Sequence, residues 1–127
     1  MNKVLVLGAG MVSRPLVSWL LGRGHILTVA DVDKEKIISI IGNHPYALAV
    51  RLDANNDEEL DLLEAQHDVV VSLLPFAIHP KVAKHCIRHK KSLVTSSYQS
   101  QAMLDLKPLI EESGIIVLNE MGLDPGI

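Results

Sequence analysis

Short aliphatic runs alternate along the chain with longer segments in which apolar residues recur at helical spacing. The runs cover residues 4–7, 26–30, 47–52, 69–74, 92–96 and 115–119, and we expect each to be a strand. Of the helical segments between them, the first covers residues 11–23, the second covers residues 34–41 with Asp33 as its cap, and the fifth covers residues 101–113. The third begins at Asp57 and the fourth at His79-Pro80. This alternation predicts a parallel sheet whose strands are joined by crossover helices.

The ends of the predicted helices carry the residues that helix ends favour. Gly24 follows the first helix, and the third opens with the acidic triplet Asp57-Glu58-Glu59, which suits the positive end of a helix dipole. Pro80 stands at the first helical position, where a missing N–H costs nothing. Pro108 lies inside the fifth segment and is expected to bend or split it.

The order of elements predicts the fold class α/β, a Rossmann-type doubly wound parallel sheet with helices on both faces. Because crossovers are right-handed, six strands are expected in the order 3-2-1-4-5-6. In such a sheet ligands bind above the carboxyl ends of strands one and four, where the strand order reverses.

The turn after the first strand predicts a dinucleotide site. Residues 4–14 read V-L-V-L-G-A-G-M-V-S-R, so Gly8 permits a tight turn and the bare backbone at Gly10 lets a pyrophosphate approach. The helix that opens near Met11 and Val12 points its unpaired N–H groups at that anion. Ser13 stands where a third glycine is usual, and two interpretations are open: a small residue at the helix–strand contact, or a hydroxyl facing the ligand.

Acidic residues at the tips of strands two and three bear on the choice of cofactor. Asp31 ends the second run, where a carboxylate can accept from both ribose hydroxyls of the adenosine and repels a 2′-phosphate. This position favours NAD over NADP as the cofactor. The alternative is that Asp31 or Asp33 only caps the following helix. Asp53, at the end of strand three, is a second candidate near the adenine.

Composition narrows the class of protein. At 127 residues, 48% hydrophobic and with a net charge of −3, the chain is expected to be one domain that binds neither nucleic acid nor membrane. Its single Cys fits a reducing compartment, and the first apolar run is too short for a signal peptide, so a cytoplasmic location is expected. The loop-like end at residues 121–127 suggests a dinucleotide-binding domain, residues 1–127, cut from a longer protein.

Several motifs together resemble one family. S-L-L-P at residues 72–75, H-P-x-V-A-K-x-C-I from His79, V-T-S-S-Y at 94–98 and N-E-M-G-L-D-P-G at 119–126 are similar to the amino-terminal domain of glutamate-forming saccharopine dehydrogenases. The resemblance implies that a nicotinamide cofactor oxidises the secondary amine of saccharopine, a small-molecule substrate, to an imine. Water then releases glutamate and 2-aminoadipate semialdehyde. It also implies a substrate and homodimerisation domain beyond Ile127, without which the isolated domain is expected to be inactive.

The resemblance places site residues at the rim of strands four to six. Tyr98 and Asp124 are the expected catalytic residues, since a tyrosine can relay a proton and a carboxylate can accept one from the amine. The substrate is expected to contact Ser13, Ser97, Tyr98 and Asp124. The cofactor is expected to contact Gly8, Gly10, Met11, Val12, Asp31, Asp53, Leu73, Leu74, Ser96 and Leu123.

The remaining reactive side chains are assigned no chemistry. His85 and His89 share one helical face but lack further ligands in the sequence pattern, so we expect a solvated face and no metal. Cys86, among apolar neighbours, is interpreted as a small buried hydrophobic residue. Two alternatives to saccharopine dehydrogenase stay open: a related carboxynorspermidine-type dehydrogenase, and a non-catalytic nucleotide-sensing module like the regulatory domains of potassium uptake systems.

Overall fold

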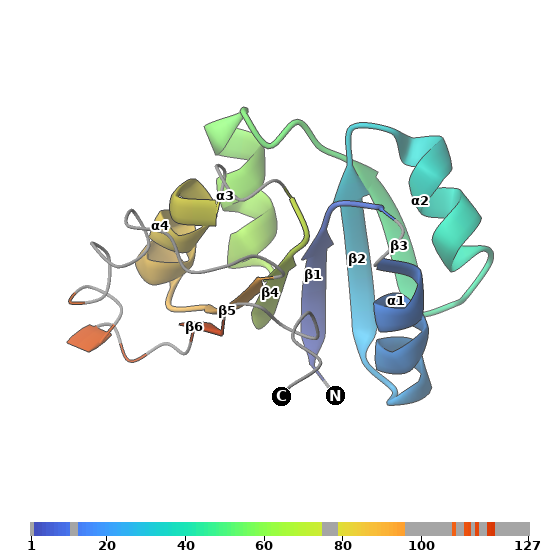
Figure 1. Ribbon diagram of the computed structural model, residues 1–127, viewed down its shortest axis with the longest axis horizontal. Helices are drawn as coiled ribbons and strands as arrows, with labels where there is room; N and C mark the ends of the chain where they lie inside the picture. The colour runs from blue at the N-terminus through green and yellow to red at the C-terminus, as the bar shows by residue number, and fades with distance from the viewer. Residues whose placement is uncertain are drawn as a thin grey trace, which may run out of the picture.

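A twisted parallel sheet forms the centre of the computed structural model (Figure 1). The structure describes residues 2–10, 13–74, 79–95, 108, 111–112, 114 and 117–118. The strands are β1 (Lys3–Leu7), β2 (Ile26–Asp31), β3 (Ala47–Arg51), β4 (Val69–Ser72), β5 (Ser92–Thr95) and β6 (Val117–Leu118). Five of them lie in the order β3-β2-β1-β4-β5, which confirms the predicted Rossmann-like arrangement for those strands.

The sixth predicted strand is represented by two residues. β6 pairs in parallel with β5, in register Leu93↔Val117 and Val94↔Leu118. The rest of the predicted strand, residues 115–116 and 119, lies outside the described residues. Of the predicted fifth helix, Pro108, Glu111 and Glu112 are described, and their backbone is helical.

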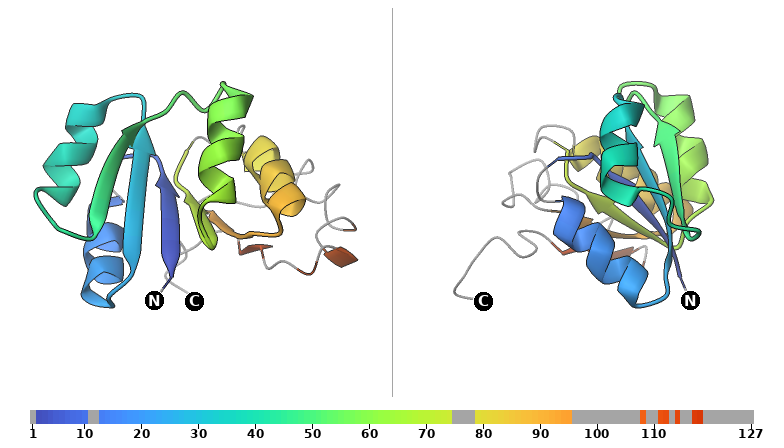
Figure 2. Two further views of the ribbon diagram at one scale, coloured as in Figure 1. Left: turned by 180° about the vertical axis from the view of Figure 1, so that it is seen from behind. Right: turned by 90° about the vertical axis from the view of Figure 1, so that its right-hand side faces the viewer.

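In the described part of the chain, helices α1 to α4 cover the two faces of the sheet (Figure 2). They are α1 (Ser13–Gly22), α2 (Lys34–Ile41), α3 (Asp57–Ala65) and α4 (His79–His89). Side chains of β1 alternate between the faces: Val4 and Val6 pack with α1 and α2, whereas Leu5 and Leu7 pack with α3 and α4. Burial on both faces explains why the strands read as continuous aliphatic runs.

Capping residues set the helix boundaries. Asp33 caps α2 as predicted, since its Oδ1 accepts from the N–H groups of Glu35 and Lys36. Asn56 caps α3 by accepting from the N–H of Glu59, so the predicted opening at Asp57 is confirmed. Within the described part of the chain, no helix is long and apolar enough to cross a membrane.

The topology brings loops from four strands to one edge of the sheet. β1 pairs with β2 on one side and with β4 on the other, all in parallel, so the order in which strands are added across the sheet reverses at β1 and β4. The turns that follow β1, β2, β3 and β4 therefore meet at the carboxyl edge, where such sheets bind ligands.

Candidate functional site

The turn after β1 depends on a glycine at position 8. Gly8 has φ +102°, a conformation that L side chains rarely adopt. A Cβ there would also lie 3.2 Å from the carbonyl carbon of Leu73, because the turn packs against the chain leaving β4. Leu73 is fixed in turn, since its N–H donates to the carbonyl of Leu7 at 2.8 Å. Both the backbone angle and the close approach require glycine here.

Gly10 differs from Gly8 because its missing side chain leaves open space. Apart from its chain neighbours, a Cβ built at Gly10 meets no atom of the described residues within 4 Å, and the residue is exposed. The fold itself therefore tolerates a side chain at this position. What a side chain would fill is the approach to the turn, the space that a pyrophosphate occupies in dinucleotide-binding folds.

Asp31 fastens this turn to the end of β2. The N–H of Ala9 donates to Asp31 Oδ2 at 2.8 Å, and the N–H of Asp33 donates to Asp31 Oδ1 at 3.0 Å. The N–H of Gly8 adds a main-chain bond to the carbonyl of Ala30 at 2.8 Å. Each carboxylate oxygen of Asp31 thus accepts a hydrogen bond from a main-chain N–H of the protein itself.

A hollow of about 150 Å³ lies beside the turn, across the ends of four strands. Its wall is apolar where Leu7, Leu52 and Leu74 contribute, and Asp31 and Asp53 supply carboxylates. The full lining is Leu7, Ala30, Asp31, Val32, Leu52, Asp53, Ala54, Asn55 and Leu74. An apolar slot with a few polar groups suits a flat heterocycle such as adenine. Three residues predicted from the sequence, Asp31, Asp53 and Leu74, meet at this hollow.

Ser13 is fully buried at the start of α1. Its hydroxyl donates to the carbonyl of Gly10, and its N–H donates to the same carbonyl at 3.1 Å. The residue therefore closes the turn from the helix side in this conformation. Its predicted contact with substrate stays a prediction.

Seven predicted site residues lie outside the described residues, and their roles stay predictions. They are Met11, Val12, Ser96, Ser97, Tyr98, Leu123 and Asp124.

Arg51 is a candidate that the sequence analysis missed. It is the last residue of β3, is exposed, and is the register partner of Asp31 on β2. Within the described residues its guanidinium has no hydrogen bond or ion pair. The signal was available, because the predicted order 3-2-1 already placed the ends of strands two and three side by side.

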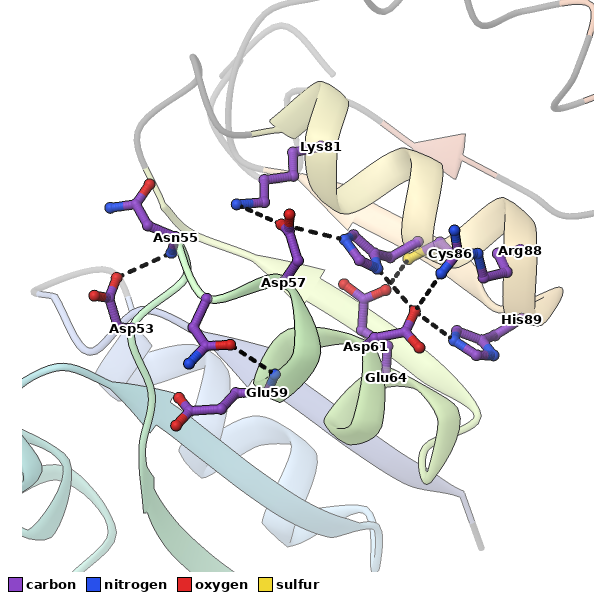
Figure 3. Close-up of polar contacts among 12 residues, drawn as sticks. Asp53, Asn55, Asp57, Glu59, Asp61, Glu64, Lys81, Cys86, Arg88 and His89 are labelled. Carbon is purple, nitrogen blue, oxygen red and sulfur yellow. Dashed lines mark hydrogen bonds and ion pairs between the residues drawn. The ribbon is translucent and has the colours of Figure 1, made fainter.

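The prediction of a solvated histidine face on α4 is wrong. The side chains of His85 and His89 are 11% and 23% exposed, and both donate to Asp61 Oδ1 on α3, at 2.9 and 2.8 Å. Figure 3 shows the basic groups of α4, among them Lys81, Arg88 and His89, turned toward the acidic groups of α3. Hydrogen bonds from His85 and His89 lower the pKa of Asp61 to about 2. No group of three or more potential ligands in the described ranges is placed to hold a metal ion.

Beneath these ion pairs lies a buried carboxyl group. Glu64 of α3 is fully buried, and its Oε2 accepts from the thiol of Cys86 at 3.8 Å. No described residue bonds to its Oε1. Burial raises the pKa of Glu64 to about 8 and raises the pKa of the Cys86 thiol as well. Cys86 is buried in the core, as predicted, and its raised pKa argues against a nucleophile.

A family model and similar curated proteins show which family the chain belongs to. Residues 4–118 match the model of the saccharopine dehydrogenase NADP binding domain. The chain is 43% identical over 126 residues to an NADP(+), L-glutamate-forming saccharopine dehydrogenase of Pyricularia oryzae, covering 99% of this chain and 28% of that protein. It is 41% identical over 127 residues to a mitochondrial alpha-aminoadipic semialdehyde synthase of Bos taurus, covering 99% of this chain and 14% of that one.

A solved structure agrees with the sequence relatives. Apo saccharopine dehydrogenase (L-Glu forming) from Saccharomyces cerevisiae superposes with a TM-score of 0.92 at 41% identity, covering 100% of this chain and 28% of that one.

These findings correct the predicted cofactor. The preference for NAD over NADP is wrong, because the matching domain model is NADP-binding and the fungal relatives are named as NADP(+) enzymes. The prediction depended on Asp31 being a ribose ligand that repels a 2′-phosphate. In the structure two main-chain N–H groups donate to that carboxylate and offset its charge, so an acid at this strand tip does not by itself select NAD.

Proposed function

Since this chain belongs to the saccharopine dehydrogenase family, we propose that it is the NADP-binding part of an enzyme that oxidises saccharopine. The observation that supports the proposal is the turn at Gly8 and Gly10. It packs against Leu73 at Gly8, is open at Gly10, and lies beside an apolar hollow. The chain spans 28% of the length of the fungal relatives, so we also propose a longer protein with a substrate domain, dimeric through that domain.

The described residues fit a dinucleotide. The open backbone at Gly10 would receive the pyrophosphate, and the hollow lined by Leu7, Leu52 and Leu74 would receive the adenine. Arg51, unpaired within the described residues, would bind the 2′-phosphate, because a guanidinium donates to a phosphate through two N–H groups at once. The cofactor supplies a hydride acceptor, its oxidised nicotinamide ring.

Tyr98 and Asp124 complete the proposed chemistry on the grounds of the resemblance. One hydride leaves the carbon beside the secondary amine and one proton leaves its nitrogen, which produces an imine. Asp124 would accept that proton, and Tyr98 would donate a hydrogen bond to a substrate carboxylate or relay a proton. Addition of water to the imine then releases glutamate and 2-aminoadipate semialdehyde.

Turnover in the longer protein tests this function. Tyr98→Phe and Asp124→Asn each remove one proton-handling group and preserve shape, so kcat for saccharopine oxidation should fall by about 100-fold or more. The affinity for NADP, measured by calorimetric titration, should stay nearly unchanged. Residues 1–127 alone should bind NADP and oxidise nothing.

Two outcomes would contradict the proposal. Wild-type kcat in either variant would exclude that residue from the chemistry. Turnover of saccharopine by residues 1–127 alone would show that no further domain is needed.

A further inference from the structure

Asp31 connects two turns that belong to different parts of the chain. Its Oδ2 accepts from Ala9, between the two glycines of the β1–α1 turn, and its Oδ1 accepts from Asp33, in the β2–α2 turn. Asp33 in turn caps α2 through its own carboxylate. One side chain therefore links the glycine turn to the first turn of the neighbouring helix.

The N–H of Ala9 depends on this carboxylate. Ala9 is 3% exposed, and its N–H makes no main-chain hydrogen bond among the described residues. A buried N–H without a partner loses its hydration and gains nothing, whereas a bond to an ionised acceptor is about twice as strong as a neutral one. The bond between Ala9 and Asp31 therefore holds the middle of the glycine turn at the end of β2.

We propose that Asp31 is a positioning residue, which holds the Gly8–Gly10 turn in its binding conformation before any ligand arrives. This role rests on the proposed function for one point only, namely that the ligand of the turn is a dinucleotide. Presetting the turn lowers the ordering cost of binding for every dinucleotide, with or without a 2′-phosphate. A ribose ligand, by contrast, would discriminate between NAD and NADP.

Amide hydrogen exchange in the ligand-free protein tests the proposal without any cofactor. Asp31→Ala removes both acceptors, so exchange of the Ala9 N–H should become about 10- to 100-fold faster. Asp31→Asn keeps one acceptor oxygen, and its effect should be smaller. Asp33→Asn is the matched control, because asparagine also caps helices well and the Ala9 bond is untouched. Unchanged Ala9 exchange in Asp31→Ala would overturn the proposal.

Calorimetric titration of NADP and NAD then separates positioning from ribose recognition. In Asp31→Asn both cofactors should lose affinity by a similar factor. Weaker NAD binding combined with tighter NADP binding would overturn the proposal and restore Asp31 as a ribose ligand. Should the wild-type protein bind neither cofactor, the proposed function would fail, while the exchange experiment would still decide the role of Asp31.

Discussion

Arg51 and Asp31 end neighbouring strands and have opposite charges, yet of these two side chains only that of Asp31 forms hydrogen bonds among the described residues. The carboxylate of Asp31 accepts from the N–H of Ala9 in the glycine turn, whereas the Arg51 guanidinium has no hydrogen bond or ion pair among the described residues. A sequence motif records that an acid stands at the strand tip but not which donors reach it. The wrong choice of NAD arose from that difference.

Arg51→Gln should therefore weaken the binding of NADP but not that of NAD. Loss of a charged hydrogen-bond donor to a phosphate costs about 1.5–3 kcal/mol, so NADP affinity should fall about tenfold or more while NAD affinity stays the same. Arg23→Gln is the matched control. It removes the same charge from a side chain that follows the C-terminal end of α1 and lies over Trp19, 4.7 Å from the ring centroid. An equal loss of affinity for NADP and for NAD in Arg51→Gln would exclude contact between Arg51 and the 2′-phosphate.

At the scale of elements, the strands and helices follow the apolar pattern because both faces of the sheet are buried. The limits of that pattern are visible at β4, which ends at Ser72 although the aliphatic run continues to Leu74. Leu74 lines the hollow instead of extending the ladder. Hydrophobicity therefore reports burial and does not report where strand pairing stops.

The contact between α3 and α4 could not be predicted from either helix alone. The pairing of His85 and His89 with Asp61 depends on how two crossover helices meet, which local sequence does not contain. The same holds for Glu64, which occupies an apolar-face position of α3 but is a carboxylic acid.

Glu64 should make stability depend on pH. Its pKa is about 8 in the folded chain against 4.5 ordinarily, so the folded state keeps a proton that the unfolded state loses between these values. The stabilisation is therefore full below pH 4.5 and is lost as pH rises through 8. The glutamine of Glu64→Gln is neutral at every pH. The free energy of unfolding of this variant, relative to that of the wild type, should therefore rise by on the order of a few kcal/mol between pH 5 and pH 8.

Urea unfolding at both pH values measures this gain. The difference between the two proteins isolates Glu64, because every other titratable group is common to both. Glu59→Gln, an exposed position on α3, is the control and should show no such gain. If Glu64→Gln and wild type lose stability in parallel from pH 5 to pH 8, Glu64 is ionised in the folded protein.

At the scale of the whole molecule, the strand order concentrates the chemistry at one edge. The strand order reverses at β1 and β4, next to the glycine turn. The ends of β2 and β3 add Asp31 and Arg51 to the same edge. The fold places the candidate dinucleotide site at this edge, whereas the proposed reaction would need the motifs at 94–98 and 119–126 and the proposed further domain.

The most direct test of the NADP-binding assignment is calorimetric titration of NADP into the wild-type protein and into Gly10→Val. The wild type should bind NADP, and Gly10→Val should lose binding while unfolding in urea at the same concentration. A Cβ at Gly10 meets no atom of the described residues within 4 Å, whereas the side chain occupies the approach of the pyrophosphate. Gly8→Ala, by contrast, should destabilise the fold itself, because of its φ of +102° and the backbone of Leu73. Unchanged NADP affinity in a folded Gly10→Val variant would show that this turn is not the dinucleotide site.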